Sequence, residues 1–325
     1  MRIGQVIYGA LIATAAASGL AGLAAAQEYP TKPIRLIVPF PPGGVADIWA
    51  RRFGQELHKA WGQQVVIDNR PGAGTTLAAN IVSKATSDGY TIYITNIGHS
   101  MSAGLYRKLP YDVLADFAPI TVVGDVTSVL AANLGLPASS AKELIAYAKA
   151  KPGQINFASA GNGTASHLYG EYMKLLAHID MVHVPYKGTA PALTDLLAGR
   201  VSLIIEPMPS ILPHIKAGKL KALGVTTAKR ASAAPEIPSI AESGVPGFDV
   251  STWYGILAPA QTRRPIIKKL HSELVRSVQS REMKERFAAE GAEPVGNTPE
   301  QFSAIIKADV ERWSKVIQKT GIVIN

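Results

Sequence analysis

The chain has 325 residues, of which 47% are hydrophobic and 18% are charged. That length suits one large domain or two of roughly 150 residues each, and the composition excludes wholesale disorder. The absence of cysteine excludes disulfides, cysteine-ligated metal sites, iron–sulfur clusters and thiol nucleophiles. With 33 Lys and Arg against 24 Asp and Glu, the formal net charge is +9, which favours anionic partners without saying of which kind.

Residues 1–26 have the pattern of a secretory signal peptide. Arg2 precedes an apolar stretch over residues 6–23, and three alanines at 24–26 end the segment. Small residues at the end of such a stretch fit cleavage after the third alanine. An uncleaved membrane anchor is the alternative, which the weak hydrophobicity of Ala and Gly disfavours. We therefore expect a mature chain that is exported to the bacterial periplasm as a soluble monomer.

Beyond residue 26 the chain alternates short apolar runs with helical patterns. Ile34–Val38 is a β-branched run that Pro39–Gly44 ends in a turn, and from Asp47 apolar residues recur with helical spacing. This alternation predicts an α/β fold with a mainly parallel sheet covered by helices on both faces. Further strands are expected at 64–67, 90–95, 155–158, 182–185, 201–205, 220–225 and 253–257, with helices between the strands from 182 to 225 and at 76–84, 140–151, 167–177, 265–279, 282–289 and 299–319.

Two glycine-bearing loops each follow a predicted strand and open a predicted helix. The first covers Asn69–Thr76 and the second covers Ser159–Ser166. A helix start has unpaired N–H groups and a partial positive charge, and glycine lets an anion approach the backbone closely. The alternative is that both are plain turns with helix caps. The residues expected to bind an anion here are Gly72, Ala73, Gly74, Thr75, Thr76, Ser159, Gly163, Thr164 and Ser166.

A third loop lies at the carboxyl end of the first predicted strand, where open α/β sheets place their ligands. It contains Gly43 and Gly44, and Asp47 follows at the helix start. Asp47 either caps that helix or accepts hydrogen bonds from a ligand. Phe40 is either an apolar wall of the site or a core residue.

Three more side chains are candidates for the same cleft. Glu206 ends the apolar run Val201–Ile205, so its carboxylate either faces the cleft or pairs with a neighbouring cation. Tyr186 is a possible wall or lid of the site. His167 follows the second glycine loop and either packs, caps the helix or contacts a ligand.

The motifs of common enzymes and of nucleic-acid binding are missing from the sequence. No histidines have the spacing of a zinc helix, no Gly-x-Ser-x-Gly elbow surrounds Ser159 or Ser166, and neither glycine loop completes a nucleotide motif. The basic residues of 216–230 lack interleaved aromatic residues and are typical of a solvated face. We expect no catalytic residue, no metal, no cofactor and no nucleic acid. A secreted hydrolase stays open only as an alternative.

Several long motifs resemble one family of receptors. At these residues the chain is similar to Bug-type solute-binding proteins, the extracytoplasmic receptors of tripartite tricarboxylate transporters, and the resemblance covers essentially all of 29–325. The motifs that carry it are Tyr29-Pro30, Pro33–Gly44 with Asp47 and Ala50-Arg51, Asn69–Gly74, Asp88–Thr91, His183–Gly188, Ala190–Leu193, Asp195–Gly199, Leu212–Ile215 and Gly244–Phe248.

The resemblance implies a two-domain Venus-flytrap of the type II periplasmic-binding class, which captures a small carboxylate in the cleft between its domains. Domain 1 would cover 27–128 plus 252–325, and domain 2 would cover 129–251. The family's ligand loops map onto Phe40–Asp47, Gly72–Thr76, Ser159–Ser166 and Glu206. Membrane permease subunits would be the partners, and a sensor kinase is the alternative partner.

Two departures from the family pattern bear on specificity. The chain has Thr75–Ala78 where the family often has Gly-Gly or Asn-Ile-Gly, and Ile204-Ile205-Glu206 where Met-Phe-Asp is common. The longer Glu206 side chain would narrow or redirect that side of the cleft. A dicarboxylate is the preferred ligand, and the carboxylate of an aromatic or amino acid is the next.

Overall fold

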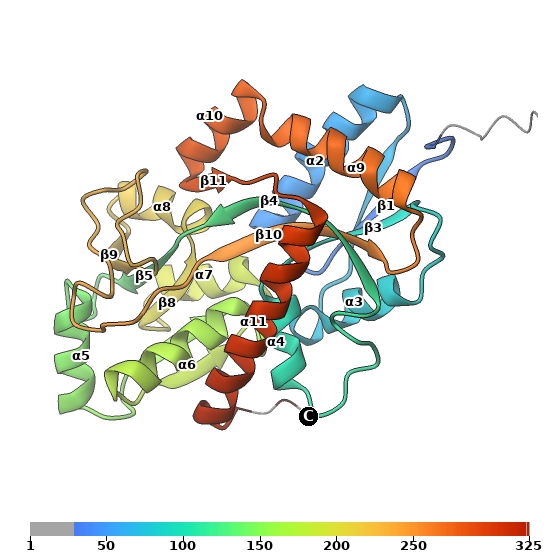
Figure 1. Ribbon diagram of the computed structural model, residues 1–325. Helices are drawn as coiled ribbons and strands as arrows, with labels where there is room; N and C mark the ends of the chain where they lie inside the picture. Colours follow the sequence, from blue (N-terminus) through green and yellow to red (C-terminus); the bar gives the residue numbers. More distant parts are fainter. Residues whose placement is uncertain (1–28, 323, 325) are drawn as a thin grey trace, which may run out of the picture.

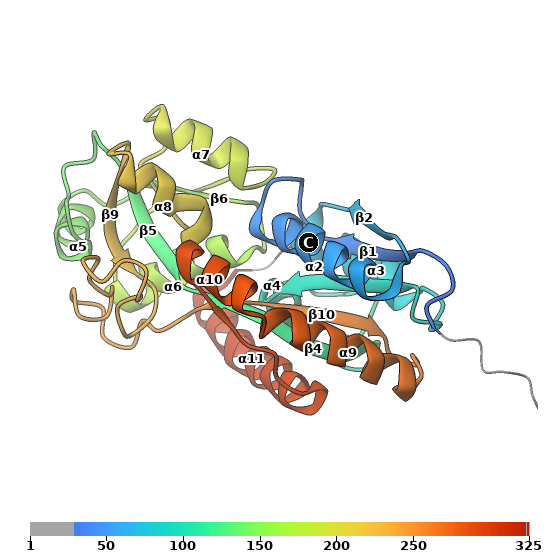
Figure 2. The same cartoon turned by 90° about the horizontal axis from the view of Figure 1, so that it is seen from above.

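Two mixed β-sheets, each covered by helices, organise the protein (Figures 1 and 2). The computed structural model describes residues 29–322 and residue 324, and the predicted signal peptide lies outside the described residues. We call each sheet with its helices a lobe, named by its number of strands. The six-stranded sheet has the order β11-β4-β10-β3-β1-β2 and the five-stranded sheet the order β7-β6-β8-β5-β9.

The strands and helices fall into the two lobes as follows. The six-stranded lobe contains β1 (Ile34–Val38), α2 (Val45–Trp61), β2 (Val65–Asn69), η1 (Ala73–Thr75), α3 (Thr76–Ser83), β3 (Thr91–Asn96), α4 (Gly98–Leu105), β4 (Phe117–Val126), β10 (Thr252–Pro259), α9 (Arg264–Val278), α10 (Arg281–Glu290), β11 (Ala292–Pro294) and α11 (Pro299–Thr320). The five-stranded lobe contains β5 (Ser128–Asn133), α5 (Ala141–Ala150), β6 (Asn156–Ser159), α6 (Ala165–Ala177), β7 (Val182–Pro185), α7 (Thr189–Leu197), β8 (Leu203–Pro207), α8 (Met208–Lys216) and β9 (Leu220–Val225).

Helices cover both faces of each sheet because successive apolar residues of a strand point to opposite faces. In β1, Leu36 packs into the core beneath α2 and α9, whereas Ile37 packs into the core shared with α3, α4 and α11. In β8, Ile204 faces α7 and α8, and Ile205 faces α5 and α6. Each of these two cores contains residues of both lobes, so the apolar packing continues across the junction.

The prediction of mainly parallel sheets is wrong, because both sheets are mixed. Strands joined by a helical crossover are parallel: β1 with β2 and β3, and β6 with β7 and β8. The strands β4, β5 and β10 make antiparallel pairs with their neighbours. These three belong to the segments that pass between the lobes, since β4 leads into β5 through Thr127 and the chain returns along residues 226–251 into β10. A strand entering from the other lobe needs no crossover helix, so it can run against its neighbours.

The two crossings lie close to the expected domain boundaries. Those boundaries, between 128 and 129 and between 251 and 252, stay a prediction. The sequence patterns did not single out β4, β5 or α4. β4 is a mostly buried strand containing Pro119 and Gly124, so it has neither a clean alternation nor an uninterrupted β-branched run. α4 begins without a side-chain cap.

Helix α11 connects the lobes from outside the sheets (Figure 1). It starts with a capping box between Thr298 and Gln301 and packs on α4, β4 and α6. Near its end, Trp313 is fully buried against Tyr169 and Tyr172 of α6, with ring centroids 5.8 Å apart in each pair. Within residues 29–322 and 324, none of the helices combines the length and the apolar composition that a membrane span requires.

Gly255 of β10 tests how tightly α11 packs on the sheet. A Cβ atom at this position would lie 2.3 Å from the ring of the buried Phe302 of α11. We expect Gly255→Ala to lower the free energy of unfolding by roughly 1–3 kcal/mol through overpacking, measured by urea denaturation. The double variant Gly255→Ala/Phe302→Leu should recover part of that loss, because the smaller side chain makes room. Strictly additive effects would contradict this account.

Candidate functional site

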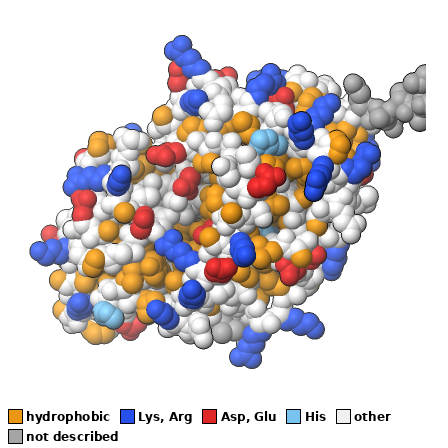
Figure 3. All heavy atoms as spheres, viewed as in Figure 1, with side chains coloured by type: hydrophobic (Ala, Val, Ile, Leu, Met, Phe, Trp, Pro, Cys, Tyr) orange, Lys and Arg blue, Asp and Glu red, His pale blue; other side chains and the backbone are white. Residues whose placement is uncertain are grey.

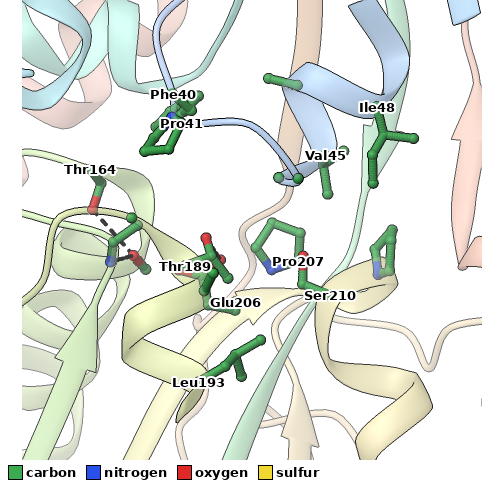
Figure 4. A pocket seen from close by; sticks show the side chains of 18 of the residues that line it. Phe40, Pro41, Val45, Ile48, Thr164, Thr189, Leu193, Glu206, Pro207 and Ser210 are labelled. Carbon is green, nitrogen blue, oxygen red and sulfur yellow. Dashed lines mark hydrogen bonds between the residues drawn. The ribbon is translucent and has the colours of Figure 1, made fainter. Parts of the chain in front are cut away.

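A cavity of about 300 Å³ lies between the two lobes. From the six-stranded lobe it is lined by the loop after β1, the first turn of α2, Asn96 of β3 and Tyr254 of β10. From the five-stranded lobe it is lined by the first turns of α6, α7 and α8 and by Glu206 of β8. Figure 4 shows Phe40 and Val45 on one side, with Thr164, Thr189 and Glu206 opposite them.

Four helices begin at this cavity. The residues at their N-caps are Gly44 for α2, Thr164 for α6, Gly188 for α7 and Pro207 for α8, and none of the four makes a side-chain cap hydrogen bond. Elsewhere, α5, α10 and α11 have serine or threonine caps, whereas α3, α4 and α9 also lack a side-chain cap. None of these six helices contributes a lining residue. The first-turn N–H groups of the four helices are therefore left to a partner other than a side-chain cap, and their dipoles give the cavity a partial positive character.

The rest of the lining is mostly apolar. Of the described residues that line the cavity, none is Lys or Arg, and Glu206 is the one acidic residue. Elsewhere, charged side chains of both signs are interspersed over the face seen in Figure 3, so the net positive charge is not gathered there. The described residues also contain no group of three His, Asp or Glu able to hold a metal ion. An anion in this cavity would be held by helix starts and hydroxyl groups rather than by a cationic side chain.

Glu206 is buried in the cavity wall. Its side chain is 4% exposed, the Thr189 hydroxyl donates to Oε2 at 3.3 Å, and Oε1 has no hydrogen-bond partner among the described residues. The nearby Ser166 hydroxyl has its own partners, the Ala160 N–H at 3.0 Å and Thr164 Oγ1 at 3.1 Å. Burial raises the pKa of Glu206 to about 7, against the opposing effect of the Ser166 and Thr189 hydroxyls. The carboxyl group can therefore carry a proton near neutral pH.

Asp47 lies behind the cavity and braces the loop in front of it. It accepts hydrogen bonds from the Gly43 N–H at 3.0 Å, from Nε and Nη2 of Arg51 at 3.1 and 3.0 Å, and from Asn69 at 3.0 Å. Asn69 also donates to the Phe40 carbonyl at 2.9 Å. Burial works to raise the pKa of Asp47, but the hydrogen bonds from Arg51, Gly43 and Asn69 together lower it below its ordinary value. Asp47 thus holds the β1–α2 loop in place, whereas Phe40, Gly43 and Gly44 line the cavity.

The first glycine loop does not line the cavity. A Cβ atom at Gly74 would lie 2.8 Å from the Asn162 carbonyl oxygen and 3.2 Å from Gly163, so this loop packs directly on the second glycine loop across the lobes. Gly72, Ala73, Thr75 and Thr76 share its position outside the lining. Ala73 O accepts hydrogen bonds from Tyr106 at 2.7 Å and from Thr76 at 2.8 Å. The structure therefore joins the two loops to each other rather than opening both towards one space.

The second glycine loop is divided between the cavity and the interior. Thr164 and Ser166 line the cavity. Ser159 is fully buried behind it, with Oγ 2.6 Å from His183 Nε2. This Ser–His pair was not visible as a motif in the sequence, and Ser159 does not reach the cavity.

His167 and His183 stack behind the second loop. Their ring centroids are 3.9 Å apart, and the Gly163 N–H donates to His167 Nδ1 at 3.2 Å. Burial lowers the pKa of His167 to about 4 and that of His183 to about 3, so both rings are neutral near pH 7. Tyr186 is also outside the lining, and its hydroxyl donates to Asp195 at 2.7 Å. These residues support the cavity wall from behind.

Sequence reasoning missed the starts of α7 and α8. Thr189, Pro209 and Ser210 line the cavity beside Glu206, although none was a candidate. One signal was present for α7: Gly188 is followed by Thr189 and then by Pro191, a pattern typical of a helix start. Asn96 and Tyr254, which are register partners across β3 and β10, gave no local signal because they meet only in the folded sheet.

Known proteins resemble this chain in both sequence and fold. The sequence model of the tripartite tricarboxylate transporter family receptor matches residues 49–322. BugT of Bordetella pertussis is 40% identical over 317 residues, which are 97% of this chain and 96% of BugT. The chain belongs to the tripartite tricarboxylate transporter receptor family. The resemblance found in the sequence motifs is thereby confirmed.

Solved structures of these receptors have the same fold. Rpa4515 of R. palustris with adipate is 36% identical with a TM-score of 0.88, over 91% of this chain and 100% of that one. The periplasmic binding protein BugD is 36% identical with a TM-score of 0.86, over 90% and 99%. MatC of Rhodopseudomonas palustris with bound malate is 31% identical with a TM-score of 0.84, over 89% and 100%. The two-domain type II periplasmic-binding fold is confirmed, and these family members are solute-binding receptors.

The buried carboxyl group of Glu206 should make the stability of this receptor depend on pH. Between its ordinary pKa of 4.5 and about 7, the folded state holds a proton that the unfolded state has lost, so the free energy of unfolding falls as the pH rises. Glu206→Gln removes this titration. Between about pH 4.5 and 7, the free energy of unfolding of the variant should rise relative to that of wild type by on the order of 3 kcal/mol. Urea denaturation at several pH values measures this difference. A difference that does not change with pH would contradict the burial argument.

Proposed function

We propose that this chain is a periplasmic receptor that captures a small carboxylate, by preference a dicarboxylate, in the cavity between its lobes. Permease subunits of a tripartite tricarboxylate transporter would receive the ligand. The observation that carries the proposal is the convergence of four helix starts, without a side-chain cap, on a cavity with no Lys or Arg among its described lining residues. Export by cleavage after residue 26 is part of the same proposal.

The physical argument concerns how an anion is held and released. Helix N–H groups stabilise a carboxylate without a buried countercharge, so the ligand can leave again without breaking a buried ion pair. The helix starts come from both lobes, α2 from one and α6, α7 and α8 from the other. Between them lie apolar residues such as Val45, Pro191 and Leu193, which suit the hydrocarbon part of a dicarboxylate. The adipate of Rpa4515 and the malate of MatC are ligands of this kind.

The proposed mechanism is binding and closure, without bond-making. One lobe binds a carboxylate first, and rotation about the two crossings brings the other lobe onto the ligand. Contacts beside the cavity support such a closed form: Gly74 meets Gly163 on one side, and a Cβ atom at Gly188 would lie 3.1 Å from Pro41 on the other. The permease would then distinguish closed from open receptors.

The predicted site residues, together with Thr189 from the structure, take two roles in this proposal. In the proposal, domain 1 covers 27–128 plus 252–325 and domain 2 covers 129–251, with the cleft between the two domains. The residues proposed to contact the ligand are Phe40, Gly43, Gly44, Thr164, Thr189, Ser166 and Glu206. The residues proposed to hold them in place are Asp47, Gly72, Ala73, Gly74, Thr75, Thr76, Ser159, Gly163, His167 and Tyr186.

The ligand class can be tested with the mature chain, residues 27–325. We expect mass spectrometry of the gently purified and then denatured protein to release a small organic acid. A thermal-shift panel should show stabilisation by dicarboxylates, because a ligand at a hundredfold its dissociation constant adds about 2.7 kcal/mol. Neutral sugars are the control and should leave the melting temperature unchanged. If a sugar shifts melting and no acid does, the proposal is wrong.

Closure can be tested at the contact between the two glycine loops. Gly74→Ala places a methyl group against Asn162 and Gly163, so the lobes should no longer close fully. We expect adipate binding, measured by calorimetry, to weaken about tenfold or more, which corresponds to about 1.4 kcal/mol.

Gly218→Ala is the matched control for that variant. Gly218 has a similar left-handed backbone, with φ of +66° against +56° at Gly74, and open space around its Cβ position. Gly218→Ala should lower the free energy of unfolding through backbone strain about as much as Gly74→Ala does, while adipate affinity stays unchanged. Equal effects of the two variants on adipate affinity would count against closure at this contact.

A further inference from the structure

Glu206 is an unusual residue for a cavity that takes anions. It is the one acidic side chain among the described lining residues, and its Oε1 atom is buried without a partner. In Figure 4 it lies beside Thr189 on the wall that faces the β1–α2 loop. A buried oxygen without a hydrogen-bond partner is costly, and Glu206 lines the cavity, so its carboxyl group is a place where a ligand group can be bound.

Among the described lining residues, no Lys or Arg lies beside Glu206. Tyr254 of β10 and His214 of α8 are the other titratable groups that line the cavity, and burial raises the pKa of Tyr254, so it stays neutral. Behind the wall, His167 of α6 is neutral near pH 7. Arg51 of α2 lies outside the lining and is paired with Asp47. The neighbouring strands β5 and β6 carry no titratable side chain.

We propose that Glu206 makes this receptor select a dicarboxylate by sharing a proton with the ligand's second carboxyl group, so that each ligand is captured together with one proton. The inference rests on the proposed function. One carboxylate of the ligand would bind at the helix starts, and the other would face the Glu206 carboxyl group.

Two ionised carboxylates facing each other in an apolar cavity repel strongly, so both cannot be charged at once. One proton between them gives a short, charge-assisted O–H···O⁻ hydrogen bond instead. The proton comes from solvent, or is already on Glu206, whose pKa burial raises to about 7. A ligand with an ammonium group would require an ionised Glu206 and would therefore bind with the opposite pH dependence.

Calorimetric titration with adipate between about pH 6 and 9 tests this proposal, in buffers that differ in ionisation enthalpy. We expect adipate affinity to fall about tenfold per pH unit above about pH 7, with proton uptake approaching one per adipate bound. Hexanoate, which has a single carboxylate, should show a weaker pH dependence and a smaller uptake.

Three variants make the assignment specific to this side chain. Glu206→Gln should bind adipate with little pH dependence and more tightly than wild type at about pH 9. Thr189→Val removes the hydroxyl that favours the ionised form of Glu206, so the fall in adipate affinity should begin at a higher pH. This variant also tests the proposal if Glu206→Gln does not fold. Glu236→Gln, at an exposed position, is the charge-matched control and should behave as wild type.

The possible outcomes separate this inference from the proposed function. Adipate binding with no proton uptake and no pH dependence would overturn the role of Glu206 and leave carboxylate capture standing. Adipate affinity that falls towards low pH would also overturn it, because adipate would then bind without taking up a proton. If neither adipate, malate nor hexanoate binds at any pH, the proposed function itself fails.

Discussion

The proposed function sets one constraint on the structure: an anion is to be held in a cavity that has no Lys or Arg among its described lining residues. The fold meets it by placing helix starts next to strand ends. β1 leads into α2, β6 into α6, β7 into α7 and β8 into α8, and the first turns of all four helices reach the cavity. Parallel strands put such starts at one edge of a sheet, which is where open α/β sheets bind ligands.

The antiparallel strands have a different task, which is to connect the two edges. Only Thr127 separates the end of β4 from the start of β5, and β10 pairs with β4 where the chain returns. Both apolar cores extend from one lobe into the other, and α11 adds contacts through Trp313. The two ligand-facing edges are therefore held opposite one another by few covalent crossings, an arrangement that permits rotation between the lobes.

Glu206 illustrates a tension between stability and binding. A buried carboxyl group with one oxygen unpartnered costs folding free energy, and no Lys or Arg among the described lining residues offsets that cost. Buried polar groups without a hydrogen-bond partner are typical of functional sites, where a ligand can supply the missing partner. Asp47, by contrast, has every hydrogen bond it needs from Gly43, Arg51 and Asn69, which is why it supports the site without facing it.

The sequence by itself determined the features that depend on neighbours along the chain. The strands at 34–38, 182–185 and 220–225 have the predicted bounds, and the family motifs identified the receptor family. Only the tertiary structure decided which helix starts share a cavity: Thr164 and Ser166 face it, whereas Gly74 packs on Gly163 and α7 and α8 enter instead. The reason is that a helix start follows from local propensity, whereas what it faces depends on how two sheets, joined by distant crossings, pack together.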